Sequence, residues 1–230
     1  FGLTRKMKGC SLFFEMNEQS NPIALSVTII TLNEEANIAR ALESVKWADE
    51  VVIYDSGSKD KTIEIDKKMG AKVLEGPWLG FGPTKRKVTE AARHDWILSL
   101  DADEEVPPKL VEEIRQKFSQ LHPEKAYQIP RLSKYLGKWI YHGGWYPDRQ
   151  TRLFNRKHSN WDSAPIHEKV QAPNIDRLTQ HFHHYVFKDI EHQVQTNNKY
   201  SSLQAKEMYN RGKKFSWFHF FTKPYVKFIE

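Results

Sequence analysis

Trp96-Ile-Leu-Ser-Leu-Asp-Ala-Asp103 is a short apolar run that ends in two carboxylates. The length of the run and its bulky apolar residues predict a buried strand over residues 96–100. Two similar runs precede it in the chain, at residues 24–30 and 51–54. Since segments with helical spacing separate the three runs, the first half of the chain predicts an α/β layer built on a mainly parallel sheet.

Helix signals occupy the segments between and after these strands. Asn33 and Ser58 each stand where a polar side chain can cap a helix that follows. Residues 71–75 predict a third, short strand, and residues 84–93 predict a helix. Pro107-Pro108 is typical of the first turn of another helix. The alternation therefore predicts a central sheet flanked by helices.

The composition excludes several classes of protein. With 39% hydrophobic and 13% aromatic residues, the chain is too rich in core-forming side chains to be disordered. Its single cysteine, Cys10, excludes an intramolecular disulfide framework and suits a reducing, cytosolic compartment. No apolar run reaches the roughly 18 residues that a membrane-spanning helix needs. The net charge of +6 is compatible with a phosphate-bearing ligand, a nucleic acid or an anionic membrane surface.

Polar segments directly follow the three main strands of the predicted sheet. Ligands bind at the carboxyl ends of parallel strands, which singles out Thr31-Leu-Asn-Glu34, Asp55-Ser-Gly-Ser58 and Asp101-Ala-Asp103. In the third segment, Asp101 and Asp103 can hold a hard divalent cation that bridges a diphosphate. A turn with two solvated aspartates is the alternative for this pair taken alone.

The other polar segments also have both a functional and a structural interpretation. Asp55 can accept a hydrogen bond from a base or a ribose hydroxyl, or it can cap a turn without any ligand. Thr31 and Glu34 can face a nucleotide, or they can belong to the start of a helix. Lys85 belongs to a basic run after a Gly/Pro-rich loop and can reach a phosphate, although such runs are more often solvated helix faces.

Three longer motifs contain these strand ends and stand in a fixed order along the chain: Ser26-Val-Thr-Ile-Ile-Thr-Leu-Asn-Glu-Glu35, Val51-Val-Ile-Tyr-Asp-Ser-Gly-Ser-Lys-Asp60 and Ile97-Leu-Ser-Leu-Asp-Ala-Asp-Glu104. Their order and spacing resemble glycosyltransferase family two, which has the GT-A (Rossmann-like) fold. Three later motifs resemble the WaaE-type lipopolysaccharide core β-glucosyltransferases of that family: Gly80-Phe-Gly-Pro83, Pro147-Asp-Arg-Gln-Thr-Arg-Leu-Phe154 and Pro165-Ile-His-Glu168. The resemblance covers residues 25–172 well and is looser beyond them.

The resemblance implies an inverting transfer of a sugar from a nucleoside diphosphate, with UDP-glucose as the donor and a heptose of the lipopolysaccharide core as the acceptor. It implies that Asp55 binds the nucleoside. It also implies that Thr31 and Glu34 lie near the nucleotide and its ribose. Asp101 and Asp103 are expected to hold Mg²⁺ or Mn²⁺ and the diphosphate, as the corresponding motif does in the family.

An inverting mechanism needs one base that takes a proton from the acceptor hydroxyl. Many relatives carry a Glu-Asp pair for this task, which this sequence lacks, and His167-Glu168 stands where that pair is expected. Glu168 is therefore predicted to be the base, with Asp148 as the alternative. The structural alternative for Glu168 is a residue at a strand edge that pairs with a nearby arginine or lysine.

Histidines cluster in the second half of the chain, at positions 181, 183 and 184. The resemblance implies that a histidine from this half completes the metal site, and His183 is predicted for that role. A zinc site made by the three histidines is a sharper alternative, but their spacing fits no standard zinc pattern. Strand histidines that merely lie beside a polar site are the remaining alternative.

The predicted organisation has three parts. Residues 1–20 are an N-terminal extension that has no counterpart in the family. Residues 21–188 are the glycosyltransferase domain that the resemblance implies, divided into a nucleotide-sugar-binding half, 21–120, and an acceptor-side half, 121–188. Residues 189–230 are a C-terminal helix and a basic, aromatic tail.

The tail, residues 209–230, interleaves eight aromatic side chains with basic ones and contains one acidic residue. Basic side chains attract anionic lipids, and aromatic rings suit the headgroup boundary of a bilayer. We therefore expect contact with the cytoplasmic face of a bacterial inner membrane, where the family finds its lipid-linked saccharide acceptors. Docking on the chain's own core or on a second subunit is the alternative for this tail.

Three other functions compete with this prediction. Transfer of the sugar to a polyprenyl phosphate would use the same kind of donor site. A sugar-phosphate nucleotidyltransferase normally carries a Gly-rich, basic loop after its first strand, and Thr31-Leu-Asn-Glu-Glu35 is not such a loop. A non-catalytic module that binds a membrane or a nucleic acid would leave the carboxylates at the strand ends unexplained, so no nucleic-acid partner is expected.

Overall fold

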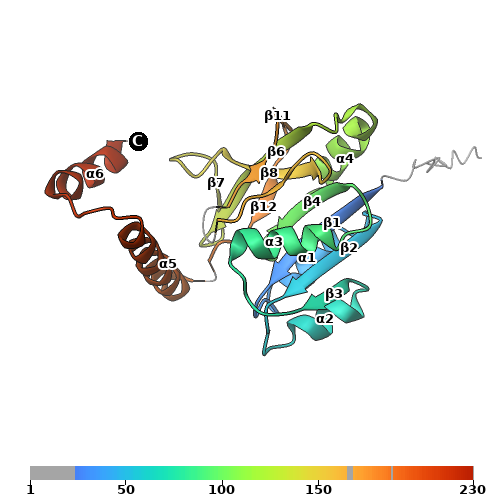
Figure 1. Cartoon of the computed structure of the whole chain (residues 1–230), viewed down its shortest axis with the longest axis horizontal. Coiled ribbons are helices and arrows are strands. Elements are labelled where there is room, and N and C mark those ends of the chain that lie inside the picture. Colours follow the sequence, from blue (N-terminus) through green and yellow to red (C-terminus); the bar gives the residue numbers. More distant parts are fainter. Residues whose placement is uncertain (1–23, 165–167, 188, 230) are drawn as a thin grey trace, which may run out of the picture.

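The computed structural model describes residues 24–164, 168–187 and 189–229. The N-terminal extension predicted for residues 1–20 lies outside this range, with Cys10, and so do the first three residues of the Pro165-Ile-His-Glu168 motif. The described residues build a central sheet of ten strands with helices packed around it (Figure 1). The α/β layer that the sequence predicts is therefore confirmed.

The first half of the sheet is parallel. Its strands stand side by side in the order β3 (Lys72–Glu75), β2 (Glu50–Asp55), β1 (Leu25–Thr31) and β4 (Trp96–Asp101). The central strands are apolar runs because both of their faces are covered. The register sets Thr31 opposite Asp55 and Ile30 opposite Asp101. The three predicted polar segments therefore meet at one end of the sheet, the end formed by the carboxyl ends of the parallel strands. This end is called the carboxyl edge below.

The second half of the sheet is mainly antiparallel, which the sequence did not predict. Here β8 (Asp148–Asn155) pairs with both β4 and β6 (Lys125–Tyr135). The remaining strands of the sheet are β12 (Phe182–His184) and β5 (Glu104–Glu105), with β7 (Lys138–Ile140) and β11 (Asn174–Arg177) also paired to β6. Since β12 pairs with β5, the histidine-rich strand lies next to the segment that follows Asp103.

Helices and a small ribbon cover the two faces of the sheet. One face packs against α1 (Ile38–Ser44), α2 (Thr62–Lys68) and α4 (Pro108–Lys117), which is followed by the 3-10 turn η1 (Phe118–Gln120). The other face packs against α3 (Phe81–Glu90) and the ribbon formed by β9 (Asn160–Trp161) and β10 (Val170–Gln171). Each large apolar side chain buried in this way contributes about 1.5–3 kcal/mol, which is the main stabilising term of the domain.

The two predicted helix caps are wrong, because each side chain joins one loop to another. Asn33 Oδ1 accepts a hydrogen bond from the Lys59 N–H (2.8 Å), and Ser58 Oγ accepts one from the Asn33 N–H (2.8 Å). Instead of Ser58, Asp60 Oδ1 accepts a bond from the N–H of Thr62, the first residue of α2 (3.0 Å). Hydrogen bonds therefore join the loops after β1 and β2, where the predicted polar segments meet.

Two helices follow the domain in the last part of the chain. α5 (Ile190–Asn210) begins after its cap Asp189, close to the predicted start, and α6 (Trp217–Ile229) forms within the predicted tail. Tyr135 of β6 donates a hydrogen bond to Gln193 Oε1 of α5 (2.6 Å). Both helices lie to one side of the sheet (Figure 1). None of the described helices is long and apolar enough to cross a membrane.

Candidate active site

Asp55 organises the turn at the carboxyl end of β2. Its side chain is fully buried, and its Oδ2 accepts hydrogen bonds from Thr31 Oγ1 (2.9 Å) and Ser58 Oγ (2.5 Å). Its Oδ1 accepts bonds from the backbone N–H groups of Gly57 (2.9 Å) and Ser58 (2.7 Å). The turn needs a glycine because Gly57 has a φ of +97°. The structure brings Thr31 and Asp55 together, and it gives both of them a structural role at this edge.

Glu34 lies in the loop that follows β1, beside the turn of Asp55. Its backbone N–H donates to Thr62 Oγ1 (2.8 Å), and its Oε2 accepts a hydrogen bond from Asn37 Nδ2 (2.9 Å). The side chain is partly exposed, so a ligand at this edge can reach it. The position fits the predicted contact with a ribose.

Asp101 lies between two cations at the end of β4. Its Oδ1 is 2.9 Å from Lys85 Nζ, and its Oδ2 accepts a hydrogen bond from Arg152 Nη2. Burial raises the pKa of the Asp101 carboxyl, but Arg152 and Lys85 outweigh burial and hold the pKa well below its usual range. Asp101 is therefore ionised at neutral pH. Lys85 was predicted to reach a phosphate of the ligand, but its ammonium contacts carboxylates of the protein.

Asp103, two residues farther on, faces a histidine. Its Oδ2 lies 3.3 Å from His184 Nε2, and the Nδ1 of the same ring lies 3.2 Å from Ser133 Oγ. The Asp103 side chain is 31% exposed and that of His184 is 12% exposed, so solvent reaches this pair while neighbouring groups orient it. The pair combines a carboxylate and an imidazole beside the ionised Asp101.

His183, which the sequence predicted for the metal site, points elsewhere. Its Nδ1 is 3.6 Å from Glu105 Oε2, and its ring lies 4.3 Å from the ring of Trp139. Burial lowers the pKa of the His183 imidazole. Since neighbouring strand residues point to opposite faces, the pairing of β12 sets His184, and not His183, beside Asp103.

Asp103 and His184 suit a divalent cation that also binds phosphate. Within the described ranges, no three His, Cys, Asp or Glu side chains form a complete metal site. Mg²⁺ is usually held by one or two carboxylates together with the phosphates of a substrate, and imidazole is a common metal ligand. A partial set of protein ligands at the edge of the sheet therefore fits a cation that arrives with a diphosphate.

The two predicted bases lie in the second half of the chain, and both pair with cations. Glu168 Oε1 is 2.7 Å from Lys85 Nζ, and the Glu168 side chain is 14% exposed. Asp148 Oδ2 accepts hydrogen bonds from Arg131 Nε (2.9 Å) and Nη2 (2.6 Å), and its Oδ1 accepts one from Gln150 Nε2 (2.7 Å). The structure therefore brings Glu168, but not Asp148, to the lysine that also contacts Asp101.

The sequence reasoning missed that a buried acid and two arginines pack together behind the strand end. Glu104 is fully buried, and its Oε1 lies 2.9 Å from Arg152 Nη2 and 3.5 Å from Arg131 Nη1. Its Oε2 accepts a hydrogen bond from the Asp101 N–H (2.9 Å). These contacts fix the backbone and the charge of Asp101. The signal that could have found them is Arg152 within the Pro147–Phe154 motif, since a buried arginine requires an acidic partner.

α5 contributes a tyrosine that lies near the same acids. Burial raises the pKa of the Tyr200 phenol, and the negative charges of Asp103, Asp101 and Glu168 raise it further. These carboxylates belong to the candidate active site, and the Tyr200 side chain itself stays 43% exposed.

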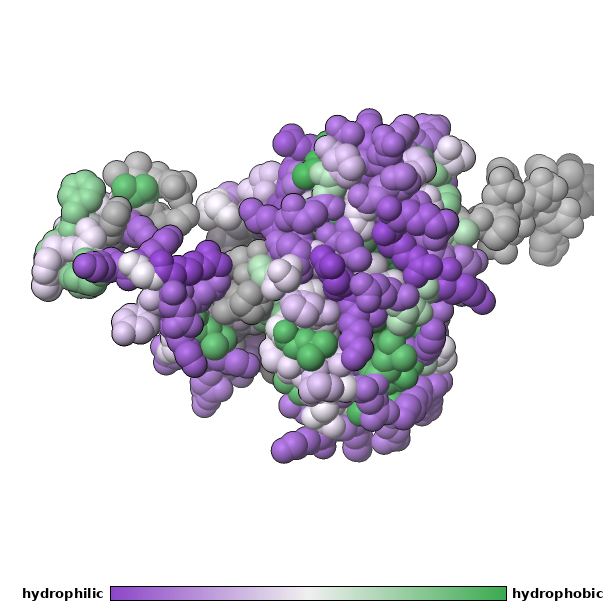
Figure 2. Space-filling model, in the orientation of Figure 1, coloured by the Kyte–Doolittle hydropathy of each residue, from purple (hydrophilic) through white to green (hydrophobic). Residues whose placement is uncertain are grey.

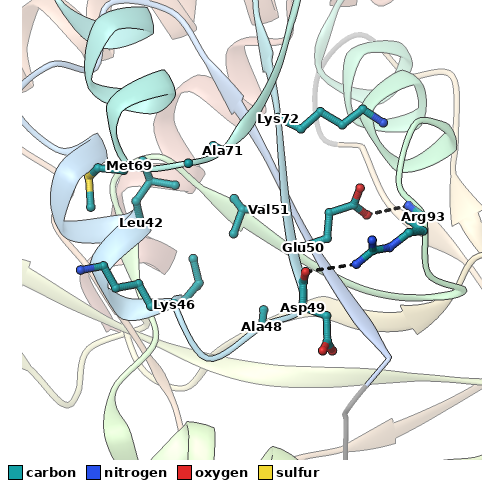
Figure 3. A pocket seen from close by; sticks show the side chains of 12 residues that line it. Leu42, Lys46, Ala48, Asp49, Glu50, Val51, Met69, Ala71, Lys72 and Arg93 are labelled. Carbon is teal, nitrogen blue, oxygen red and sulfur yellow. Dashed lines mark hydrogen bonds between the residues drawn. The ribbon is translucent and has the colours of Figure 1, made fainter.

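A cavity of about 330 Å³ lies at the opposite edge of the sheet (Figure 3). Its lining includes Glu50 and Lys72, the first residues of β2 and β3, and also Arg93. The Arg93 N–H donates to Glu50 Oε2 (2.6 Å), and Arg93 Nη2 donates to the Asp49 carbonyl (3.3 Å). Since ligands of parallel sheets bind at the carboxyl ends of the strands, this cavity is separate from the candidate active site.

Comparisons with known proteins place this geometry in context. The chain matches the family model described as Glycosyl transferase family 2 over residues 26–177. An uncharacterized glycosyltransferase of Rickettsia typhi is 38% identical over 219 residues, which cover 90% of this chain and 75% of the relative. The lipopolysaccharide core biosynthesis glycosyltransferase LpsC of Rhizobium meliloti is 28% identical over 90% of this chain and 80% of that protein. The structure of S. aureus TarS 1-349 in complex with UDP-GlcNAc has the same fold, with a TM-score of 0.53 and 16% identity; the match covers 73% of this chain and 60% of the TarS chain.

Proposed function

Because the chain belongs to glycosyl transferase family 2, we propose that it moves a sugar from a nucleoside diphosphate to an acceptor hydroxyl, with inversion at the anomeric carbon. The proposed donor is UDP-glucose, and the proposed acceptor is a heptose of the lipopolysaccharide core, carried on a lipid. The similarity to LpsC supports this class of acceptor. The WaaE-type motifs in the sequence support the choice of glucose and heptose.

The observation that carries the proposal is the meeting of Asp101, Asp103 and His184 at the carboxyl edge of β4. Glu34, which is partly exposed, and the turn of Asp55 lie at the same edge. They follow β1 and β2, the first and second strands beside β4. A donor that lies along the edge would meet Glu34 and the Asp55 turn with its nucleoside. Its diphosphate would lie at Asp103.

Asp103 and His184 are the residues that would hold Mg²⁺ or Mn²⁺, which would neutralise charge on the departing diphosphate. Asp101 contributes in a different way, because Lys85 and Arg152 already neutralise it. We assign Asp101 to the orientation of this strand end. The side chain of His184 stays oriented because its other ring nitrogen contacts Ser133 Oγ.

Glu168 is the proposed base. Lys85 contacts Glu168 at one oxygen, Oε1, whereas both carboxylate oxygens of Asp148 accept hydrogen bonds from other side chains. In the reaction, a Glu168 oxygen takes the proton as the acceptor oxygen bonds to the anomeric carbon. The bond from that carbon to the diphosphate breaks, and its electron pair leaves with the nucleotide. This direct displacement accounts for inversion.

The proposed location is the cytoplasmic face of the bacterial inner membrane, with α6 as the contact to anionic lipids. The exposed aromatic side chains of α6 recur along a broad stripe of the helix: Trp217, Phe218, Phe220, Phe221, Tyr225 and Phe228. Lys213 and Lys214 precede the helix, and Lys223 lies off the stripe. Hydrophobic and hydrophilic residues adjoin in this part of the molecule, away from the sheet (Figure 2). A helix of this kind binds in the interface of an anionic bilayer.

The test is a transfer assay with purified protein, a panel of UDP-, GDP- and TDP-sugars, and Mg²⁺ or Mn²⁺. Each donor is offered with a heptose-containing core acceptor and, separately, with a polyprenyl phosphate. We expect metal-dependent glucose transfer to the core acceptor, with inverted configuration in the product. Transfer only to the polyprenyl phosphate would overturn the acceptor assignment, and a retained configuration would overturn the mechanism.

A further inference from the structure

Lys85 is buried between two carboxylates that belong to different halves of the domain. Its ammonium lies 2.9 Å from Asp101 Oδ1 and 2.7 Å from Glu168 Oε1, and 4.7 Å from the centre of the Trp161 ring. The Lys85 side chain is 4% exposed. With two carboxylates and an aromatic face around it, the ammonium offers little surface to a nucleotide. This arrangement differs from the donor contact that the sequence predicted for Lys85.

The backbone around Lys85 is built to hold this position. The Gly82 N–H of α3 donates to the Ala164 carbonyl (3.1 Å), and a Cβ on Gly82 would lie 2.4 Å from the Asp162 carbonyl oxygen. Only glycine therefore allows α3 to approach this segment so closely. Arg86, the residue after Lys85, donates to the Trp161 carbonyl (3.0 Å). Hydrogen bonds thus join α3 to residues 161–164, which precede Glu168 in the chain.

The two carboxylates depend on Lys85 to different degrees. Asp101 also has Arg152 as a partner, so it keeps one cation if Lys85 is removed. Among the residues that the structure describes, Lys85 is the only cation paired with Glu168. Removing one partner of a buried ion pair leaves the other charge without compensation. Loss of Lys85 would therefore affect Glu168 more than Asp101.

We propose that Lys85 is a positioning residue for proton transfer, which holds the Glu168 carboxylate in place through their ion pair without binding the sugar donor. This inference rests on the proposed function, because it takes Glu168 as the base. When Glu168 accepts the acceptor's proton and becomes neutral, Lys85 keeps Asp101 as its partner. The ammonium is then never left as an unpaired buried charge, which would be costly.

The experiment separates Lys85→Met, which removes the charge, from Lys85→Arg, which keeps it. Lys87→Met is the matched control, since Lys87 is exposed on the same helix. We expect Lys85→Met to bind UDP with Mn²⁺ within about threefold of wild type, while kcat falls by about 100-fold or more, the scale of a lost acid–base contribution. Lys85→Arg should recover part of kcat, and Lys87→Met should match the wild type in both measurements. A Lys85→Met variant that loses UDP affinity but keeps its kcat would show a donor ligand and overturn the proposal.

A double-mutant cycle with Glu168→Gln separates an effect of Lys85 that acts through Glu168 from a general loss of structure. If Lys85 acts through Glu168, Lys85→Met should change kcat by less than about threefold in the Glu168→Gln background. Equal effects of Lys85→Met in both backgrounds would overturn the positioning role. If Glu168→Gln alone keeps the wild-type kcat, the base assignment fails first. If Glu168→Gln is inactive and Lys85→Met is fully active, only the present inference fails.

Discussion

Replacing Asp66 with asparagine should stabilise the protein above neutral pH. Asp66 lies on α2 and is fully buried, and within the described part of the chain neither of its carboxylate oxygens has a hydrogen-bond partner. Burial raises the pKa of the Asp66 carboxyl from its ordinary 3.8 to about 7, with added repulsion from Asp55 and Asp60. The folded protein therefore prefers the neutral acid. Asparagine has the same shape and cannot ionise.

The size and sign of the effect follow from proton linkage. Each pKa unit is worth about 1.4 kcal/mol, so a change from 3.8 to about 7 corresponds to about 4 kcal/mol. Because the folded pKa is the higher one, the favourable term is fully present below pH 4. It is lost as the pH rises from about 4 to about 7. Asp66→Asn should thus equal the wild type near pH 4 and exceed it by up to about 4 kcal/mol at pH 8.

The assay is urea unfolding followed by tryptophan fluorescence at several pH values between 4.5 and 8. Glu64→Gln is the control, because Glu64 is exposed on the same helix and its replacement removes the same charge. The difference between Asp66→Asn and wild type should grow with pH, while the difference for Glu64→Gln stays flat. A difference that does not change with pH, or an asparagine variant that is less stable at pH 8, would refute the reasoning.

Three further predictions concern the site and the C-terminal helix. Glu168→Gln should lower the rate of transfer by about 10²–10⁴-fold while UDP affinity is retained. Steady-state kinetics should show a smaller loss for Asp148→Asn. A larger loss for Asp148→Asn would show that Asp148 is the base. His184→Ala should weaken Mn²⁺ binding in the presence of UDP by about tenfold or more, as followed by electron paramagnetic resonance. His183→Ala should have little effect there, since His183 contacts Glu105. Deletion of residues 215–230 should reduce co-sedimentation with phosphatidylglycerol vesicles at 0.1 M salt, and equal sedimentation of both proteins would remove the membrane role of α6.

The strands of the parallel half could be predicted because they are buried on both faces. Continuous apolar residues such as those at 25–30 and 96–100 leave little choice between strand and loop. Their carboxyl ends then had to meet, and the register of Thr31 with Asp55 bears this out. The antiparallel pairing of the second half escaped prediction because it joins strands far apart in the chain, such as β4 and β8, and because β5 and β12 have only two and three residues.

The sequence predicted where the acidic residues of the site lie, but it did not predict which side chains they contact. Asp101 and Asp103 follow a strand, and this local signal is sufficient to place them. The choice between His183 and His184 depends on which face of β12 turns toward Asp103, and only the pairing of the strands decides that. The pair of Lys85 and Glu168 joins residues 83 positions apart, and no local pattern contains such a contact.

The beginning of α3 shows how a tertiary contact overrides a local signal. The glycines and prolines of residues 76–83 predicted a loop, yet α3 begins at Phe81. Gly82 is helical there because its missing side chain lets the helix touch the Asp162 and Ala164 carbonyls. The residue that weakens a helix in isolation thus allows this one to reach the site.

We propose that Asp103 and His184 form a metal-dependent site for a nucleoside diphosphate at the carboxyl ends of the parallel strands. Isothermal titration calorimetry of UDP with Mn²⁺, with Mg²⁺ and with EDTA, on the wild type and on Asp103→Asn, measures this dependence on metal. We expect the wild type to bind UDP at least about tenfold more tightly with metal than with EDTA, and Asp103→Asn to lose that difference. Equal UDP affinity with and without metal, or an Asp103→Asn variant that keeps the metal dependence, would contradict the assignment.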